Sequence, residues 1–116
     1  MAEARSRLDD ARFNLDASRL GIAASAAYYA MLYAARAALS ERDLYAKTHS
    51  GVWSAFGAEF VASGSFTPEL AQVAARAQRI RELGDYEAKP PSGAEAAALV
   101  EDAERFVDAV LGLLDG

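Results

Sequence analysis

The stretch that decides the fold spans residues 20–40 and reads LGIAASAAYYAMLYAARAALS. Apolar side chains recur in it at Ile22, Ala26, Tyr29, Leu32 and Tyr33, the three-and-four spacing of one helical face. Half of the other positions are alanine, so few strongly polar side chains interrupt the segment. A helix of this kind is buried on most sides, and we expect it to be the central helix of the fold.

The composition extends this expectation to the whole chain. The 116 residues include 28 alanines but only ten β-branched residues, which favours helix over sheet. Polar or proline-containing breaks at 40–47, 63–68 and 89–93 leave about five helical segments joined by short loops. We therefore predict an all-α fold, an antiparallel up-down bundle of four to five helices that forms one domain over residues 1–116.

Local signals place the other helices. The segment at about 2–18 repeats an apolar residue every three or four positions and is amphipathic. Thr48 is the predicted N-cap of a helix that runs to about residue 62 with an aromatic core face, including Trp53. Thr67 and Pro68 are a predicted N-cap and first helical residue for a helix that continues towards Tyr86.

The last helix follows a capping box formed by Ser92 and Glu95. Its apolar stripe, which includes Leu99, Phe106 and Val110, is wide enough to serve a bundle core and a dimer face together.

Several classes of function are excluded or disfavoured. The chain has no cysteine and one histidine, and it has no glycine-rich phosphate loop, so we expect no metal and no cofactor. A net charge of -5 argues against a protein with a broad basic face for duplex DNA. Without a signal peptide or a membrane-spanning run, we expect a soluble cytoplasmic protein.

His49 is the first candidate for chemistry. It lies at the predicted start of the third helix, where the helix dipole and nearby Lys47 favour a neutral ring that suits a general base. Arg42 precedes it with six residues between, and an Arg to hold a phosphate with a His to move a proton can cleave RNA without a metal. The equally weighted alternative is that His49 only shares the N-cap role with Thr48 and Ser50.

The remaining candidates are cationic. Arg76, Arg79 and Arg81 form either an anion-binding strip on the fourth helix or a solvated charged face, in which Arg81 pairs with Asp85. Arg36 lies on the most apolar helix and needs a carboxylate or a ligand anion beside it. The tyrosines at positions 28, 29 and 33 need hydrogen-bond partners, which we expect in loop backbone or across the bundle.

Together these stretches resemble HEPN-domain proteins over nearly the whole chain. The resemblance rests on AAYYAM at 26–31, AARAAL at 34–39, KTHSGV at 47–52, the segment 56–61 and RELGDY at 81–86. The chain is most similar to the short, stand-alone subgroup with the patterns AYYA, KTHSG and R-x-x-x-D-Y.

The resemblance implies a homodimer with a polar cleft at its interface, and often a minimal nucleotidyltransferase as partner protein. Many members are metal-independent ribonucleases of toxin–antitoxin systems, with an Arg and, four to six residues later, a His on the fourth helix. The corresponding stretch here, from Arg79 and Arg81 to Asp85 and Tyr86, contains no His.

Three functions stay open. In the leading hypothesis the chain is the toxin-like half of a pair: it binds nucleotide or RNA, and a nucleotidyltransferase does the chemistry. The predicted ligand contacts are Lys47, Arg79 and Arg81, together with Arg36, Arg42, Asp85 and Tyr86. In the second, the chain is itself an endoribonuclease in which His49 acts with Arg42 or Arg79. In the third, it is a non-catalytic helical adaptor that recruits a partner through its last helix.

Overall fold

The computed structural model describes residues 1–86 and 89–115, apart from the side chains of Asp85 and Tyr86. The elements are α1 (Ala2–Asp16), α2 (Leu20–Ser40), α3 (His49–Phe56), the π-helix η1 (Gly57–Val61), α4 (Pro68–Tyr86) and α5 (Gly93–Asp115). No strand occurs in this described part of the chain, so the predicted all-α fold with five helical segments is confirmed.

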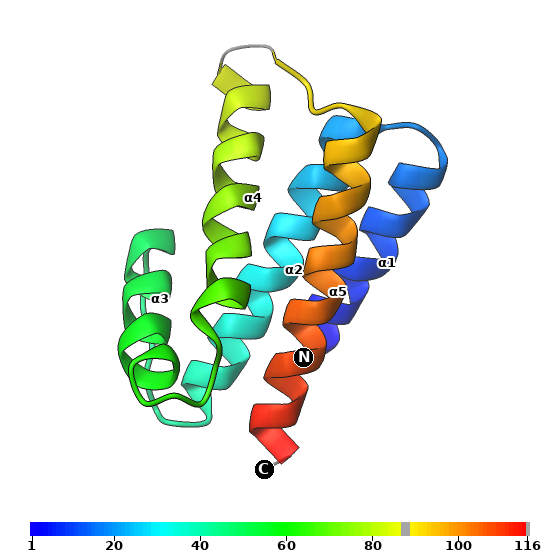
Figure 1. Cartoon of the computed structure of the whole chain (residues 1–116). Coiled ribbons are helices and arrows are strands. Elements are labelled where there is room, and N and C mark those ends of the chain that lie inside the picture. The colour runs from blue at the N-terminus through cyan, green and yellow to red at the C-terminus, as the bar shows by residue number, and fades with distance from the viewer. Residues whose placement is uncertain (87–88, 116) are drawn as a thin grey trace.

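Helix α2 is the centre of the bundle, as its sequence predicts. It contacts α1, α4 and α5, and these four helices alternate in direction along the chain (Figure 1). Eight of its alanines are buried, together with Tyr28, Met31, Leu32 and Leu39. From α1 the predicted stripe faces this core, with Ala4 and Ala11 buried and Leu8 and Leu15 partly buried against it.

The predicted helix starts are confirmed by their hydrogen bonds. Thr48 Oγ1 accepts from the Gly51 backbone N–H at 3.0 Å at the start of α3. At the start of α5, Glu95 N–H donates to Ser92 Oγ at 3.1 Å, and Ser92 N–H donates to Glu95 Oε1 at 3.0 Å. Local sequence therefore determines where these two helices begin.

The third segment differs from its prediction at one point. It reaches residue 61, but its last five residues form the π-helix η1 and not a continuous α-helix. Within the segment, the Phe60 ring contacts that of Phe56 with centroids 5.1 Å apart, and Phe56 in turn meets Phe66 edge-on at 5.0 Å. From outside the segment, the Arg42 guanidinium lies 5.1 Å from the Phe60 centroid. Tertiary aromatic packing thus accompanies a wider turn that the residue spacing does not signal.

Helix α3 and η1 lie beside α4 at the edge of the bundle (Figure 1). The contacts of α3 with the four long helices are mainly with α2. Side chains of α3 also reach α5, where Trp53 and Phe56 contact the ring of Phe106.

Candidate functional site

The hydroxyl group of Tyr28 joins α3 to the central helix. Tyr28 has no solvent-exposed surface, and its Oη lies 3.1 Å from His49 Nδ1 and 3.2 Å from Trp53 Nε1. His49 and Trp53 are four residues apart on α3, so they lie on the same helical face. The expectation that a buried tyrosine hydroxyl bonds across the bundle is confirmed for Tyr28.

An arginine from α4 completes this cluster. The guanidinium of Arg81 lies over the rings of Tyr28 and Tyr29, at 5.2 and 5.4 Å from their centroids. These distances are within the range of cation–π attraction. The His49 ring meets Tyr29 edge-on, with centroids 5.9 Å apart and planes at 84°. Three elements therefore bring an imidazole, a guanidinium and two phenol rings together.

A second arginine acts on the same histidine. Burial lowers the pKa of His49 from its ordinary value of 6.5, and the positive charges of Arg36 on α2 and Arg81 on α4 lower it further. Arg36 is partly buried and has no ion pair with a carboxylate among the described residues. We call the group formed by Tyr28, Tyr29, Arg36, His49 and Arg81 the His49 site.

The phenol of Tyr28 stays protonated at neutral pH. Burial raises its pKa, although the hydrogen bond from Trp53 and the charge of Arg81 act in the opposite direction. The site therefore combines a neutral imidazole and a neutral phenol with the permanent charges of two guanidinium groups. Guanidinium groups form strong, charge-assisted hydrogen bonds to anions, so the chemistry of these side chains suits an anionic ligand.

At the start of α3, Thr48 caps the helix and the ring of the next residue, His49, points to Tyr28. Thr48 accepts the free backbone N–H of Gly51, and its Oγ1 lies 3.4 Å from Ser50 Oγ. A Cβ on Gly51 would lie 2.9 Å from Thr48 Oγ1, which explains a glycine at this position. The cap thus involves Thr48, whereas the His49 ring bonds to Tyr28.

A cleft of about 550 Å³ opens next to the site, between α1, α2 and α4. Tyr29, Arg81 and Arg7 of α1 form part of its wall. The Arg7 guanidinium is 6.0 Å from the Tyr29 centroid and 5.7 Å from that of Tyr33. Arg7 is not among the residues predicted from the sequence, where its one signal is that it precedes Leu8, which packs against the core.

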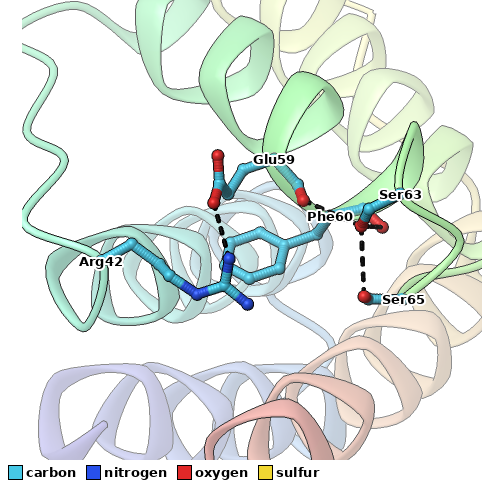
Figure 2. Close-up of polar contacts among 5 residues, drawn as sticks. All are labelled: Arg42, Glu59, Phe60, Ser63 and Ser65. Carbon is cyan, nitrogen blue, oxygen red and sulfur yellow. Dashed lines mark hydrogen bonds and ion pairs between the residues drawn. The ribbon is translucent and has the colours of Figure 1, made fainter.

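The structure places Arg42 elsewhere. Figure 2 shows its guanidinium against Glu59 and Phe60 of η1, with Arg42 Nη1 2.6 Å from Glu59 Oε1 and its Cζ 5.1 Å from the Phe60 centroid. Beside them, the Ser63 hydroxyl donates to the carbonyl of Glu59 at 2.9 Å. None of the contacts described for Arg42 involves His49, so the spacing of these two residues along the chain does not bring them together.

The other predicted cations are not joined to the cluster. Lys47 and Arg79 are exposed, and neither has an ion pair among the residues that the structure describes. Arg79 is two positions from Arg81, and helix geometry directs side chains at that spacing to different faces. Arg76 lies 3.6 Å from the carboxylate of Asp102 on α5.

Two further predicted contacts lie outside the described side chains. Asp85 and Tyr86 are the last residues of α4, but only their backbone is described. The expected pairing of Arg81 with Asp85 falls there too. Within the described residues no group of three metal-ligating side chains occurs, and no helix has the length and apolar content to cross a bilayer.

Comparison with known proteins gives a match over almost the entire chain. The family model of the HEPN domain matches residues 1–113. A UPF0332 protein of Gloeobacter violaceus is 34% identical over 116 residues, covering 98% of this chain and 92% of the relative. A UPF0332 protein of Thermotoga maritima is 36% identical over 113 residues, with 97% and 86% covered. A Methanocaldococcus jannaschii protein named "Putative toxin MJ0605" is 33% identical over 88 residues, with 76% and 66% covered.

Proposed function

The chain belongs to the HEPN domain family, and from this premise we propose that it is a toxin-like protein that binds phosphate groups of a nucleotide or of RNA at the His49 site. The name of the M. jannaschii relative supports the toxin-like role. The observation that carries the proposal is the cluster in which the Arg81 guanidinium lies 5.2 and 5.4 Å from the ring centroids of Tyr28 and Tyr29, and His49 Nδ1 lies 3.1 Å from Tyr28 Oη. The charge of Arg36 also acts on His49 and lowers its pKa.

The arginines at the His49 site favour an anionic ligand, although the chain as a whole is negatively charged. The chain carries a net charge of -5, yet two arginines, Arg36 and Arg81, act on His49, and the carboxylate of Glu82 acts on Tyr28 less strongly than Arg81 does. Two phenol rings lie below Arg81, and such rings can also stack on bases. Arg7 extends the cationic surface along the cleft.

A partner protein is part of the proposal. We propose that the chain forms a homodimer and works with a nucleotidyltransferase, as the sequence resemblance implies. Phe13 and Ile22 support a protein contact, because these large apolar side chains are 68% and 57% exposed at the junction of α1 and α2. Light scattering of the purified chain tests the dimer, and a monomer at micromolar concentration would remove this part of the proposal.

A binding assay tests whether the His49 site binds nucleotide or RNA. It uses a fluorescent single-stranded oligoribonucleotide, with an unlabelled nucleotide as competitor. Arg36→Gln and Arg81→Gln each remove a charged donor, so we expect each to weaken binding about tenfold or more. Arg5→Gln is the matched control, because Arg5 is exposed on α1 and belongs to neither the site nor the cleft. Equal losses in all three variants would show only a nonspecific charge effect and would contradict the proposal.

A second candidate is a metal-independent endoribonuclease. The neutral state of His49 beside two arginines favours it, since a neutral imidazole can take part in proton transfer. The discriminating assay is cleavage of labelled RNA with a chelator present, comparing wild type with His49→Ala and Arg79→Ala. Cleavage lost with His49→Ala would establish the enzyme. Binding without cleavage would support the nucleotide- or RNA-binding role alone.

A further inference from the structure

The hydrogen bonds around Tyr28 determine which way each donor points. The indole Nε1–H of Trp53 can only donate, so at 3.2 Å Tyr28 Oη is the acceptor. The hydroxyl hydrogen of Tyr28 must then find an acceptor of its own. Because Tyr28 has no exposed surface, bulk water does not supply one.

His49 Nδ1 is the acceptor that the structure provides. It lies 3.1 Å from Tyr28 Oη, and no other acceptor of this hydroxyl occurs among the described residues. A neutral imidazole that accepts at Nδ1 carries its hydrogen on Nε2. The opposite tautomer would direct two N–H donors at Oη and leave the buried hydroxyl hydrogen without a partner, which is costly.

We infer that Trp53 and Tyr28 form a hydrogen-bond relay that fixes the proton of His49 on Nε2, so that the imidazole presents an N–H donor to an oxygen of the bound anion. The identity of that anion as a phosphate rests on the proposed function. Trp53 and Tyr28 are positioning residues here, because they act on the ligand only through His49.

With its hydrogen on Nε2, His49 is a hydrogen-bond donor towards the ligand and not a general base. A general base needs a lone pair on the nitrogen that faces its substrate, and the relay leaves the lone pair on Nδ1, where Tyr28 uses it. The charged groups that bear on the ring are Arg36 from α2 and Arg81 from α4, and both disfavour imidazolium. The relay therefore favours an anion-binding His49 over a proton-accepting one.

The test detects the proton position directly. His49 is the one histidine of the chain, so its ring nitrogens are assigned without ambiguity in a ¹⁵N-labelled sample. In wild type, long-range ¹H–¹⁵N spectra at pH 7.5 should show the hydrogen on Nε2, with the Nδ1 shift of a hydrogen-bonded acceptor. We expect the Nε2–H form to exceed the other tautomer about tenfold or more. A hydrogen on Nδ1 would overturn the relay, and this readout needs no variant.

A pair of variants isolates the hydroxyl group. Tyr28→Phe removes the donor to Nδ1, so the Nδ1 shift should move to the value of a free acceptor and the Nε2–H fraction should fall. Tyr29→Phe is the matched control, because its ring contacts His49 but no hydrogen bond joins them among the described contacts. Circular dichroism checks that both variants fold. An unchanged Nδ1 shift in folded Tyr28→Phe would overturn the role of Tyr28.

Titration with inorganic phosphate tests the anion site independently of the hydrogen-bond relay. In wild type the Nε2–H proton should shift downfield as phosphate binds, and Arg81→Gln should raise the phosphate concentration needed about tenfold. An Nε2–H tautomer without any response to phosphate would contradict the proposed anion site while the relay itself is confirmed. A response to phosphate with the hydrogen on Nδ1 would support the anion site and contradict the relay.

Discussion

At the scale of a single residue, His49 couples the site to the stability of the fold. Its pKa is lower in the folded chain than its ordinary value of 6.5, which applies to the unfolded chain. At a pH between these two pKa values, His49 binds more protons in the unfolded state than in the folded state. The contribution of His49 to the free energy of unfolding is therefore fully present above about pH 6.5, and it is lost as the pH falls through the lowered pKa.

Urea unfolding at pH 7.5 and 5.5 measures this effect. We expect wild type to lose more stability than His49→Asn over this interval, by at most about 1 kcal/mol, because solvent screens a partly exposed ring. Asn keeps an acceptor for the Tyr28 hydroxyl but does not titrate. An identical pH dependence in the two proteins would show that the pKa of His49 is the same in the folded and unfolded chains.

Individual residues also show how far the sequence predicts the site. The need of Tyr28 for a partner follows from its burial, but His49 is 21 residues away along the chain and only the fold brings the two together. The interval from Arg42 to His49 crosses a loop, where chain spacing carries no information about distance. In the structure Arg42 pairs with Glu59 instead.

At the scale of the element, the N-cap of α3 determines how firmly His49 is presented. Thr48→Ala removes the acceptor of the Gly51 N–H, and we expect it to cost about 1 kcal/mol of stability. Thr48→Ser is the matched control and should keep most of the cap. Thr67→Ala at the start of α4 should cost less, because the distance from Leu70 N to Thr67 Oγ1 is 3.4 Å.

Chemical denaturation followed by the fluorescence of Trp53, which lies on α3, measures these losses. If Thr48→Ala and Thr48→Ser unfolded at the same denaturant concentration, the cap would contribute nothing to the folded chain. A loss in Thr48→Ala that also weakens ligand binding would link the cap to the site, since His49 directly follows the cap residue.

The predicted elements differ in accuracy for a physical reason. Helix starts at Thr48 and Ser92 follow from groups within three residues of each other, so the sequence predicts them well. The π-helix at the end of the third segment contacts residues that lie outside it in the chain, since Arg42 pairs with Glu59 and lies over Phe60, and the Phe66 N–H donates to the Phe60 carbonyl. Structure that rests on distant contacts has no local signal in the sequence.

At the scale of the whole molecule, small side chains permit the close packing that builds the site. Helix α2 buries eight alanines, and it is in contact with α1, α4 and α5. Because alanine adds little width, neighbouring helices can approach closely. Arg81 of α4 and Arg7 of α1 can then both reach the tyrosines of the same helix.

Enlarging one of these alanines tests that packing. Ala30 has no exposed surface on α2, and Ala30→Leu adds three carbons to a filled interior, so we expect a loss of about 1–3 kcal/mol. Ala98→Leu makes the same change at an exposed position of α5 and should stay within about 0.5 kcal/mol of wild type. Because Ala and Leu are both good helix formers, the difference reports packing alone. Equal stability of the two variants in urea would mean that the bundle has room beside α2. Close helix packing would then not explain why Arg7 and Arg81 both reach the tyrosines of α2.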